Sequence, residues 1–125
     1  MQYQVIICDD SKLGRRSVNR CLPEGFASEV HMAANGLEAM EILRAQPIDV
    51  LFLDLTMPVM EGVEVLQHIL LEKIDVAVIV ISGDVQPKMQ QRVIELGALE
   101  FIKKPLQEAQ LVETLKKFDL LPEQV

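Results

Sequence analysis

The chain has 125 residues, of which 50% are hydrophobic and 25% are charged. This length and balance fit one globular domain and exclude a disordered or fibrous chain. The formal net charge of −7 argues against a surface that binds nucleic acid or an anionic membrane directly, because such surfaces are basic. No apolar run is long enough to cross a membrane, and the first residues lack the basic character of a signal peptide. We therefore expect a cytoplasmic location.

Apolar periodicity divides the chain into ten alternating elements. Short continuous apolar runs indicate strands that are buried on both faces, and apolar residues three and four apart indicate helices. In chain order we expect a strand over residues 5–8, a helix over 11–22, an edge strand over 29–33, a helix over 36–46, a strand over 50–53, a helix after Gly62, a strand over 77–81, a helix from Pro87 to near Gly97, a strand over 101–102 and a helix from Pro105 to Phe118.

Capping residues mark several helix ends. Asp10 or Ser11 can cap the first helix and Asn35 the second, because short polar side chains accept hydrogen bonds from the free N–H groups of a first turn. Proline is favoured in a first turn, so Pro87 and Pro105 are expected to open the last two helices.

The alternation of strands and helices predicts an α/β fold with a doubly wound parallel sheet, right-handed crossovers and helices on both faces. Five strands and five helices in a chain of this length fit the strand order 2-1-3-4-5, which has a switch point between the first and third strands. Ligands of such sheets bind beyond the carboxyl ends of the strands. The residues that directly follow the predicted strands are therefore the first candidates for a site.

Polar side chains stand at these strand ends. Asp9 and Asp10 follow the first strand, Asp54 the third, Ser82 the fourth, and Lys104 lies just beyond the fifth. Three converging carboxylates repel one another, and a hard divalent cation such as Mg²⁺ relieves that repulsion with oxygen ligands. The same cation, with Lys104 and the Ser82 hydroxyl, would favour a phosphoryl group. Asp54 is the best candidate for the nucleophile, because it follows the central strand.

These strand ends resemble the receiver domains of two-component response regulators, with chemotaxis-type single-domain regulators among them. The resemblance extends over residues 4–118 and is carried by Asp9–Asp10, the segment Asp54–Gly62, Ser82–Gly83 and Lys104–Pro105. It implies a flavodoxin-like fold, a receiver (phosphoacceptor) domain over residues 1–121, and a tail or the start of a linker to an output domain over residues 122–125.

By this resemblance, Asp54 accepts a phosphoryl group from a sensor histidine kinase or a phosphotransfer protein. Mg²⁺ would be held by Asp10 and Asp54, by Asp9 through water, and by the backbone carbonyl of Thr56. Lys104 would contact the phosphoryl group. The domain would catalyse only its own phosphorylation and dephosphorylation, so it is not expected to be an enzyme in the usual sense.

The resemblance also implies a switch and a set of rate-modulating residues. Ser82 and Phe101 match a hydroxyl and an aromatic position whose linked movement relays phosphorylation to the face made by the fourth helix, fifth strand and fifth helix. A downstream protein or a fused effector domain would read this face, and a phosphorylation-dependent homodimer could form through it. Thr56 and Asp84, two residues beyond Asp54 and Ser82, would modulate the phosphorylated lifetime.

Two alternatives stay open at this point. A phosphorylation-independent pseudo-receiver, which only binds partners, would have the same fold. A phosphohydrolase of the haloacid dehalogenase type also uses aspartate and Mg²⁺, but such enzymes resemble one another in an Asp-x-Asp motif, and here Thr56 stands where the second aspartate after Asp54 would be.

The remaining chemistry-bearing residues are expected to be structural. Cys8 and Cys21 have no metal-ligand spacing and are expected to be buried thiols. Arg15, Arg16 and Arg20 are expected on a solvated face of the first helix, with kinase docking as the alternative.

Overall fold

The structure is a computed structural model that describes residues 2–84 and 86–121. The tail predicted over residues 122–125 lies outside the described residues. The elements in chain order are β1 (Tyr3–Cys8), α1 (Lys12–Cys21), β2 (Ala27–Ala33), α2 (Gly36–Ala45), β3 (Val50–Leu53), α3 (Gly62–Glu72), β4 (Ala77–Ser82), α4 (Pro87–Glu95), β5 (Glu100–Lys103) and α5 (Glu108–Lys117).

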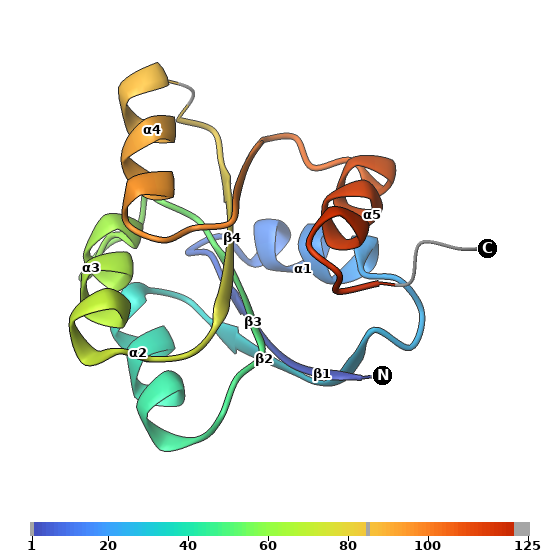
Figure 1. The fold of residues 1–125 in the computed structure, drawn as a ribbon, viewed down its shortest axis with the longest axis horizontal. Coiled ribbons are helices and arrows are strands. Elements are labelled where there is room, and N and C mark those ends of the chain that lie inside the picture. The colour runs from blue at the N-terminus through green and yellow to red at the C-terminus, as the bar shows by residue number, and fades with distance from the viewer. Residues whose placement is uncertain (1, 85, 122–125) are drawn as a thin grey trace.

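The five strands form one parallel sheet in the order β2-β1-β3-β4-β5. Figure 1 shows α1 and α5 on one face of this sheet and α2, α3 and α4 on the other. The predicted fold class, strand order and edge position of β2 are therefore confirmed. The carboxyl ends of β1 and β3 are neighbours at the switch point of this topology.

Alternating side chains of the strands fill two separate cores. On β1, Ile6 and Cys8 pack into a cluster with α2, α3 and α4, whereas Val5 and Ile7 pack into a cluster with α1 and α5. Successive side chains of a strand point to opposite faces of a sheet, so a strand covered on both faces has no place for a polar residue. This is why the continuous apolar runs mark the strands. We call these cores the α2–α4 cluster and the α1/α5 cluster.

The helix caps follow the predicted residues at two of the helices. Ser11 Oγ accepts a hydrogen bond of 3.2 Å from the Gly14 N–H, and Asn35 Oδ1 accepts one of 2.9 Å from the Glu38 N–H. These bonds satisfy first-turn donors that would otherwise have no partner. They also fix where the chain leaves β1 and β2 at the end of the sheet.

Several predicted boundaries are wrong: β1 begins at Tyr3 and not at residue 5, and β5 extends from Glu100 to Lys103 beyond the predicted residues 101–102. Pro105 does not open the last helix, because Leu106 packs half-buried against the α1/α5 cluster and Gln107 is extended (φ −112°, ψ 136°), so α5 begins at Glu108. The second strand begins before the predicted residue 29, because parallel pairing with β1 continues to Ala27. Backbone pairing of this kind extends beyond the apolar run that predicts the strand.

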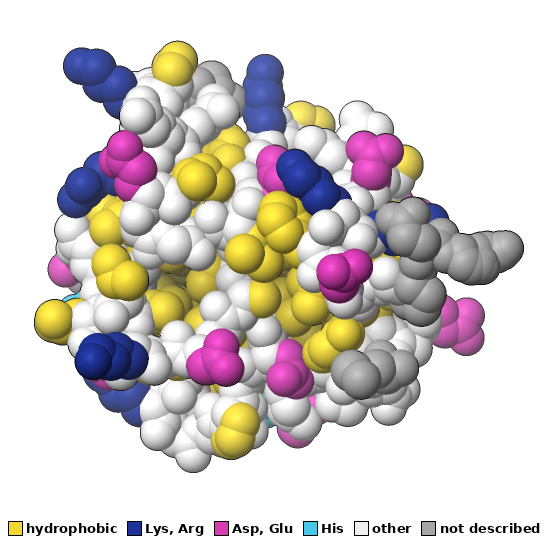
Figure 2. Space-filling view, in the orientation of Figure 1, with side chains coloured by type: hydrophobic (Ala, Val, Ile, Leu, Met, Phe, Trp, Pro, Cys, Tyr) yellow, Lys and Arg dark blue, Asp and Glu magenta, His cyan; other side chains and the backbone are white. Residues whose placement is uncertain are grey.

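The face of the molecule drawn in Figure 2 exposes hydrophobic side chains between helices. Figure 2 shows hydrophobic side chains in the hollow between α4 and α5, with charged side chains around its margin. Among the described residues, no helix is long and apolar enough to cross a membrane.

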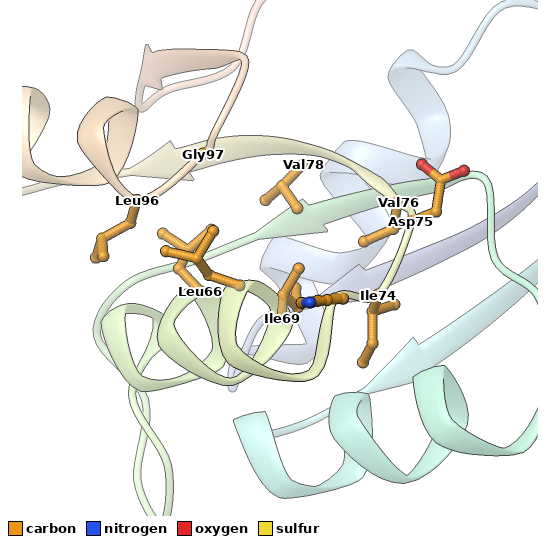
Figure 3. A pocket seen from close by; sticks show the side chains of 10 residues that line it. Leu66, Ile69, Ile74, Asp75, Val76, Val78, Leu96 and Gly97 are labelled. Atoms are coloured by element: carbon orange, nitrogen blue, oxygen red, sulfur yellow. The ribbon is translucent and has the colours of Figure 1, made fainter.

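A cavity of about 400 Å³ lies between α3, β4 and the end of α4. Figure 3 shows Leu66 and Ile69 of α3 facing Val78 of β4, with Leu96 at the far side. The cavity is beside the α3–β4 and α4–β5 connections, which lie at the amino ends of β4 and β5. It is therefore at the opposite end of the sheet from the predicted site.

Candidate functional site

Three acidic side chains meet where β1 and β3 end. Asp9 and Asp10 follow β1, and Asp54 follows β3. One carboxylate oxygen of each residue lies within 4.8 Å of the other two. Asp9 and Asp54 are only 3% and 6% exposed, whereas Asp10 is exposed to solvent. The adjacent carboxyl ends of two parallel strands thus produce a half-sheltered acidic cluster.

Lys104 reaches this cluster from the end of β5. Its Nζ donates a hydrogen bond of 2.9 Å to Asp9 Oδ2 and lies 3.7 Å from Asp54 Oδ2. The Lys104 backbone N–H donates to the Ser82 carbonyl at 2.9 Å, and the Lys104–Pro105 peptide bond is cis. The ammonium therefore bridges both buried carboxylates.

Burial is the largest influence on the pKa values of Asp54 and Lys104, and the charges of neighbouring groups act against it or add to it. Burial raises the pKa of Asp54 above its ordinary value; Lys104 opposes this rise, and the charge of Asp9 adds to it. The Leu55 N–H donates to Asp54 Oδ1 at 2.9 Å and partly stabilises the ionised form. For Lys104, burial works to lower the pKa, but the hydrogen bond to Asp9 and the charge of Asp54 outweigh it and raise the pKa. A single ammonium thus leaves excess negative charge at the site.

Asp9 is fixed by groups on three sides. Its Oδ1 accepts a hydrogen bond of 2.8 Å from the Ser11 N–H, Oδ2 accepts the one from Lys104, and its backbone carbonyl accepts one of 2.7 Å from Arg15 Nη1. Within residues 2–84 and 86–121, no hydrogen bond or ion pair holds the side chain of Asp10. The cluster thus combines one fixed carboxylate with one that is free to adapt.

Sequence reasoning missed the contact of Arg15 with the site. We expected Arg15 on a solvated face of α1, but it is half-buried and its guanidinium turns back to the Asp9 carbonyl. A basic residue in the second turn of a helix is common, so nothing in the sequence distinguishes this arginine from Arg16 and Arg20, which are exposed.

The other candidate residues lie around the cluster. Ser82 is the fully buried last residue of β4, and its Oγ accepts a hydrogen bond of 3.1 Å from the Asp84 N–H. Thr56 is exposed, two residues beyond Asp54. Phe101 of β5 is half-buried and packs against the α2–α4 cluster. No hydrogen bond joins the Ser82 hydroxyl to Asp54 in this structure.

Cys8 lies directly before the acidic pair, where a thiolate could bind a metal. Burial, with the charges of Asp9 and Asp54, raises the pKa of Cys8 to about 12. Its Sγ lies 3.4 Å from both the Asn35 carbonyl oxygen and Met57 Sδ. Cys8 is therefore a buried neutral thiol, as predicted, whereas Cys21 is only half-buried.

The donor set fits a hard divalent cation. The three clustered groups offer carboxylate oxygens, two of them sheltered and one open to solvent. Oxygen ligands with room for water suit Mg²⁺ better than softer metals, which prefer thiolate or imidazole. A bound cation would also offset the repulsion that contributes to the raised pKa of Asp54.

Comparison with known proteins identifies the family. Residues 5–116 match the model of the response regulator receiver domain. The chain belongs to this family, in which an aspartate of the domain generally accepts a phosphoryl group in two-component and chemotaxis signalling. The receiver resemblance inferred from the strand-end residues is confirmed.

Relatives of known sequence include both short and long proteins. The chain is 32% identical to the chemotaxis protein CheY of Thermotoga maritima over 117 residues, which cover 94% of this chain and 98% of that protein. It is 38% identical over 107 residues to a protein-glutamate methylesterase/protein-glutamine glutaminase of Clostridium acetobutylicum, covering 83% of this chain but only 31% of that protein. The chain thus spans about a third of the methylesterase relative and nearly all of CheY.

Solved structures show the same fold. The CheX–CheY–BeF3–Mg complex of Borrelia burgdorferi contains a chain with a TM-score of 0.85 and 31% identity, covering 93% of this chain and 89% of that one. The signal receiver domain of the putative response regulator NarL from Mycobacterium tuberculosis has a TM-score of 0.85 and 28% identity, covering 94% of this chain and 95% of that one.

Proposed function

We propose that Asp54 is the phosphoacceptor of a signalling switch, within a receiver domain over residues 1–121. The donor is a phosphohistidine of a sensor histidine kinase or of a phosphotransfer protein. One observation carries this proposal: the buried Asp54 carboxylate lies 3.7 Å from the Lys104 ammonium and beside two further carboxylates. This arrangement supplies a nucleophile together with the charges that a phosphoryl group requires.

The transfer forms one bond and breaks another. An oxygen of the Asp54 carboxylate bonds to phosphorus as the phosphorus–nitrogen bond to the donor histidine breaks, and the released imidazole takes up a proton. The product is an aspartyl phosphate. Lys104 offsets its charge, and an ion pair at about 4 Å with an effective dielectric constant near 20 contributes roughly 4 kcal/mol before desolvation. The domain would catalyse only this transfer and the later hydrolysis of the aspartyl phosphate, in which water takes the phosphoryl group as inorganic phosphate and the Asp54 carboxylate is restored.

Mg²⁺ is the proposed cofactor. Asp10 and Asp54 would hold it, with Asp9 acting through water and the backbone carbonyl of Thr56 as a further ligand. When bound, Mg²⁺ supplies the positive charge that phosphoryl oxygens require in the transition state. The acidic cluster of this chain and the Mg²⁺ in the complex of Borrelia burgdorferi CheY support this assignment.

The proposed output passes through Ser82 and Phe101. Phosphorylation would draw the Ser82 hydroxyl away from the Asp84 N–H toward a phosphoryl oxygen, and Phe101 would repack beside it. Reversing a two-state population from 1:99 to 99:1 takes about 5.5 kcal/mol, which is similar to one new ion pair plus one hydrogen bond. The apolar surface between α4 and α5 in Figure 2 suits a downstream protein, a fused effector domain or a second receiver.

Thr56 and Asp84 are proposed to set the rates. Asp84 is half-buried beside Ser82, so its charge should repel anionic small-molecule donors more than a docked kinase. An Asp84→Asn variant should therefore react faster with acetyl phosphate. An unchanged rate would remove Asp84 from this role.

Intact mass spectrometry tests the proposed function. With Mg²⁺ and acetyl phosphate, the wild-type chain should gain the mass of one phosphoryl group, and EDTA should abolish the gain. Asp54→Asn should abolish it too, whereas Asp75→Asn, an exposed aspartate at the other end of β4, should leave it intact. If neither acetyl phosphate nor a panel of sensor kinases phosphorylates the wild type, the chain is a pseudo-receiver that acts without phosphorylation.

A further inference from the structure

The start of α1 lies so close to Asp9 that position 14 of the helix has no room for a side chain. Gly14 faces the Asp9 carboxyl group, and a Cβ atom placed on Gly14 would lie 2.7 Å from Asp9 Cγ. Real Cβ atoms do not come that close to other heavy atoms. The absence of a side chain at position 14 therefore creates the space that the Asp9 carboxylate occupies.

Arg15, the next residue of the helix, holds the backbone of the same aspartate. Its Nη1 donates to the Asp9 carbonyl at 2.7 Å, and because the guanidinium is charged, this bond is stronger than one between neutral groups. At the same end of the helix, the Ser11 N–H donates a hydrogen bond to Asp9 Oδ1. The start of α1 thus holds both the side chain and the backbone of Asp9, in addition to the hydrogen bond from Lys104.

We propose that Gly14 and Arg15 are positioning residues, which fix Asp9 from α1 and thereby set how Asp9 meets Lys104 and a divalent cation. The inference deepens the proposed function and rests on it for the cation. Removal of a group that orients a metal ligand without binding the metal itself commonly lowers metal affinity by about 10- to 100-fold. Neither residue is a proposed ligand of the cation or of the phosphoryl group, and both approach Asp9, so their effect would pass through Asp9.

Two measurements on purified, metal-free protein test the role of Arg15. The first is the Mg²⁺ dissociation constant from calorimetric titration, and the second is the amide resonance of Ser11 in a ¹H–¹⁵N spectrum, because this amide donates to Asp9 Oδ1. Arg15→Ala should weaken Mg²⁺ binding about tenfold and move the Ser11 resonance. Arg15→Lys should restore most of the affinity, because one N–H group is enough for the single bond to the carbonyl.

Arg16→Ala is the matched control. It removes the same charge from the same helix, from an exposed residue without a hydrogen bond to Asp9. It should leave the Ser11 resonance in place and change Mg²⁺ affinity far less than Arg15→Ala. If Arg15→Ala and Arg16→Ala weaken binding by the same factor, the effect is one of charge alone and the positioning role of Arg15 is wrong.

Gly14→Ala separates positioning from folding. Alanine favours a helix over glycine, which offsets part of the cost of displacing the buried Asp9 carboxylate, so this variant should stay folded while its Cβ moves that carboxylate. Mg²⁺ affinity should fall at least tenfold. Ser17→Ala, one turn further along α1, should leave the affinity unchanged. Unchanged Mg²⁺ affinity in Gly14→Ala would overturn the role of Gly14.

The outcomes also separate this inference from the proposed function. If the wild type neither binds Mg²⁺ nor accepts a phosphoryl group, the proposed function fails. The Ser11 resonance still decides whether Arg15 fixes Asp9, because that readout needs neither the cation nor phosphorylation. A resonance that moves in Arg15→Ala supports positioning, and one that stays in place refutes it.

Discussion

Val59 has a backbone conformation that its side chain disfavours. It lies in the loop between Asp54 and α3 with φ 69°, in the left-handed region, and its side chain is 73% exposed. A left-handed conformation costs an ordinary residue about 1–2 kcal/mol, and asparagine tolerates it better than a β-branched residue does. The loop beside the candidate site therefore carries strain without any burial of the Val59 side chain to offset it.

Replacing Val59 by asparagine should therefore stabilise the protein. We expect Val59→Asn to raise the melting temperature by several degrees, since about 1 kcal/mol shifts it by roughly 4 °C in a domain of this size. Val59→Thr keeps the β-branch and the shape, so it should not have this effect. Thermal melts of the three proteins in EDTA provide the comparison, and equal gains in both variants would show that the gain comes from polarity.

Asp54 makes metal-free stability depend on pH. Because its folded-state pKa is raised above the ordinary value of 3.8, the folded state holds the proton more tightly than the unfolded chain does. The stability from Asp54 is complete below pH 3.8 and is lost as pH rises through the folded-state pKa. In EDTA, Asp54→Asn should therefore melt several degrees higher than the wild type at pH 7.

The same comparison at low pH is the control. Near pH 3.5, where Asp54 is largely protonated in both states, the difference between wild type and Asp54→Asn should become small. A difference that is equal at both pH values would indicate that the asparagine acts through packing and not through charge.

At the scale of elements, an ion pair joins α2 to α3. Arg44 donates two hydrogen bonds to the Glu72 carboxylate, at 2.9 and 2.6 Å, and His68 Nδ1 lies 3.3 Å from it. The hydrogen bond with Arg44 lowers the pKa of Glu72. A lowered pKa gives stability that is present above the unfolded value of 4.5 and is lost as pH falls through the folded value.

Glu72→Gln should accordingly lower the melting temperature slightly at pH 7 and leave it unchanged near pH 2.5. The effect should be small and should shrink further at 1 M salt, because the pair is largely exposed. Glu41→Gln, on an exposed position of α2, serves as the control for loss of one negative charge. Equal effects of the two variants would show that net charge, and not the bond to Arg44, accounts for the change.

Elements whose ends depend on local chemistry were predictable from the sequence. The apolar run at Val50–Leu53 gives β3 without error, and Asn35 marks the start of α2, because burial and capping act within a few residues. Pro105 misled the prediction of α5, since the packing of Leu106 against a core built from distant residues decides the path there. Local patterns report such long-range packing poorly.

The candidate site divides in the same way. The sequence predicted the proximity of Asp9, Asp54 and Lys104, because the strand order and the strand ends determine where these residues lie. The contact of Arg15 with Asp9 could not, because it depends on which of several side-chain directions a helical arginine takes. The space left by Gly14 depends on how closely α1 approaches the end of β1, and no periodicity encodes that distance.

At the scale of the whole molecule, cation binding should stabilise the fold. A ligand that binds only the folded state adds about 2.7 kcal/mol when its concentration is 100 times the dissociation constant. Saturating Mg²⁺ should therefore raise the melting temperature of the wild type by roughly 10 °C. EDTA should reverse the rise, and Asp10→Asn should reduce it.

K⁺ provides the comparison for this measurement. K⁺ at matched ionic strength screens the net charge of −7 without needing a specific site, so it measures the contribution of screening alone. We expect that contribution to be small. If K⁺ raises the melting temperature as much as Mg²⁺ does, general screening accounts for the stabilisation and the acidic cluster is not a specific cation site.

The ion pair between Lys104 and Asp9 joins residues that are 95 positions apart. During synthesis, Asp54 leaves the ribosome long before Lys104 does, and until β5 takes its place at the edge of the sheet the acidic cluster lacks its ammonium group. An unfinished or truncated chain that ends before residue 104 cannot assemble the complete site. Under the proposed function, only a chain that contains nearly the whole folded domain would have the complete phosphoacceptor site.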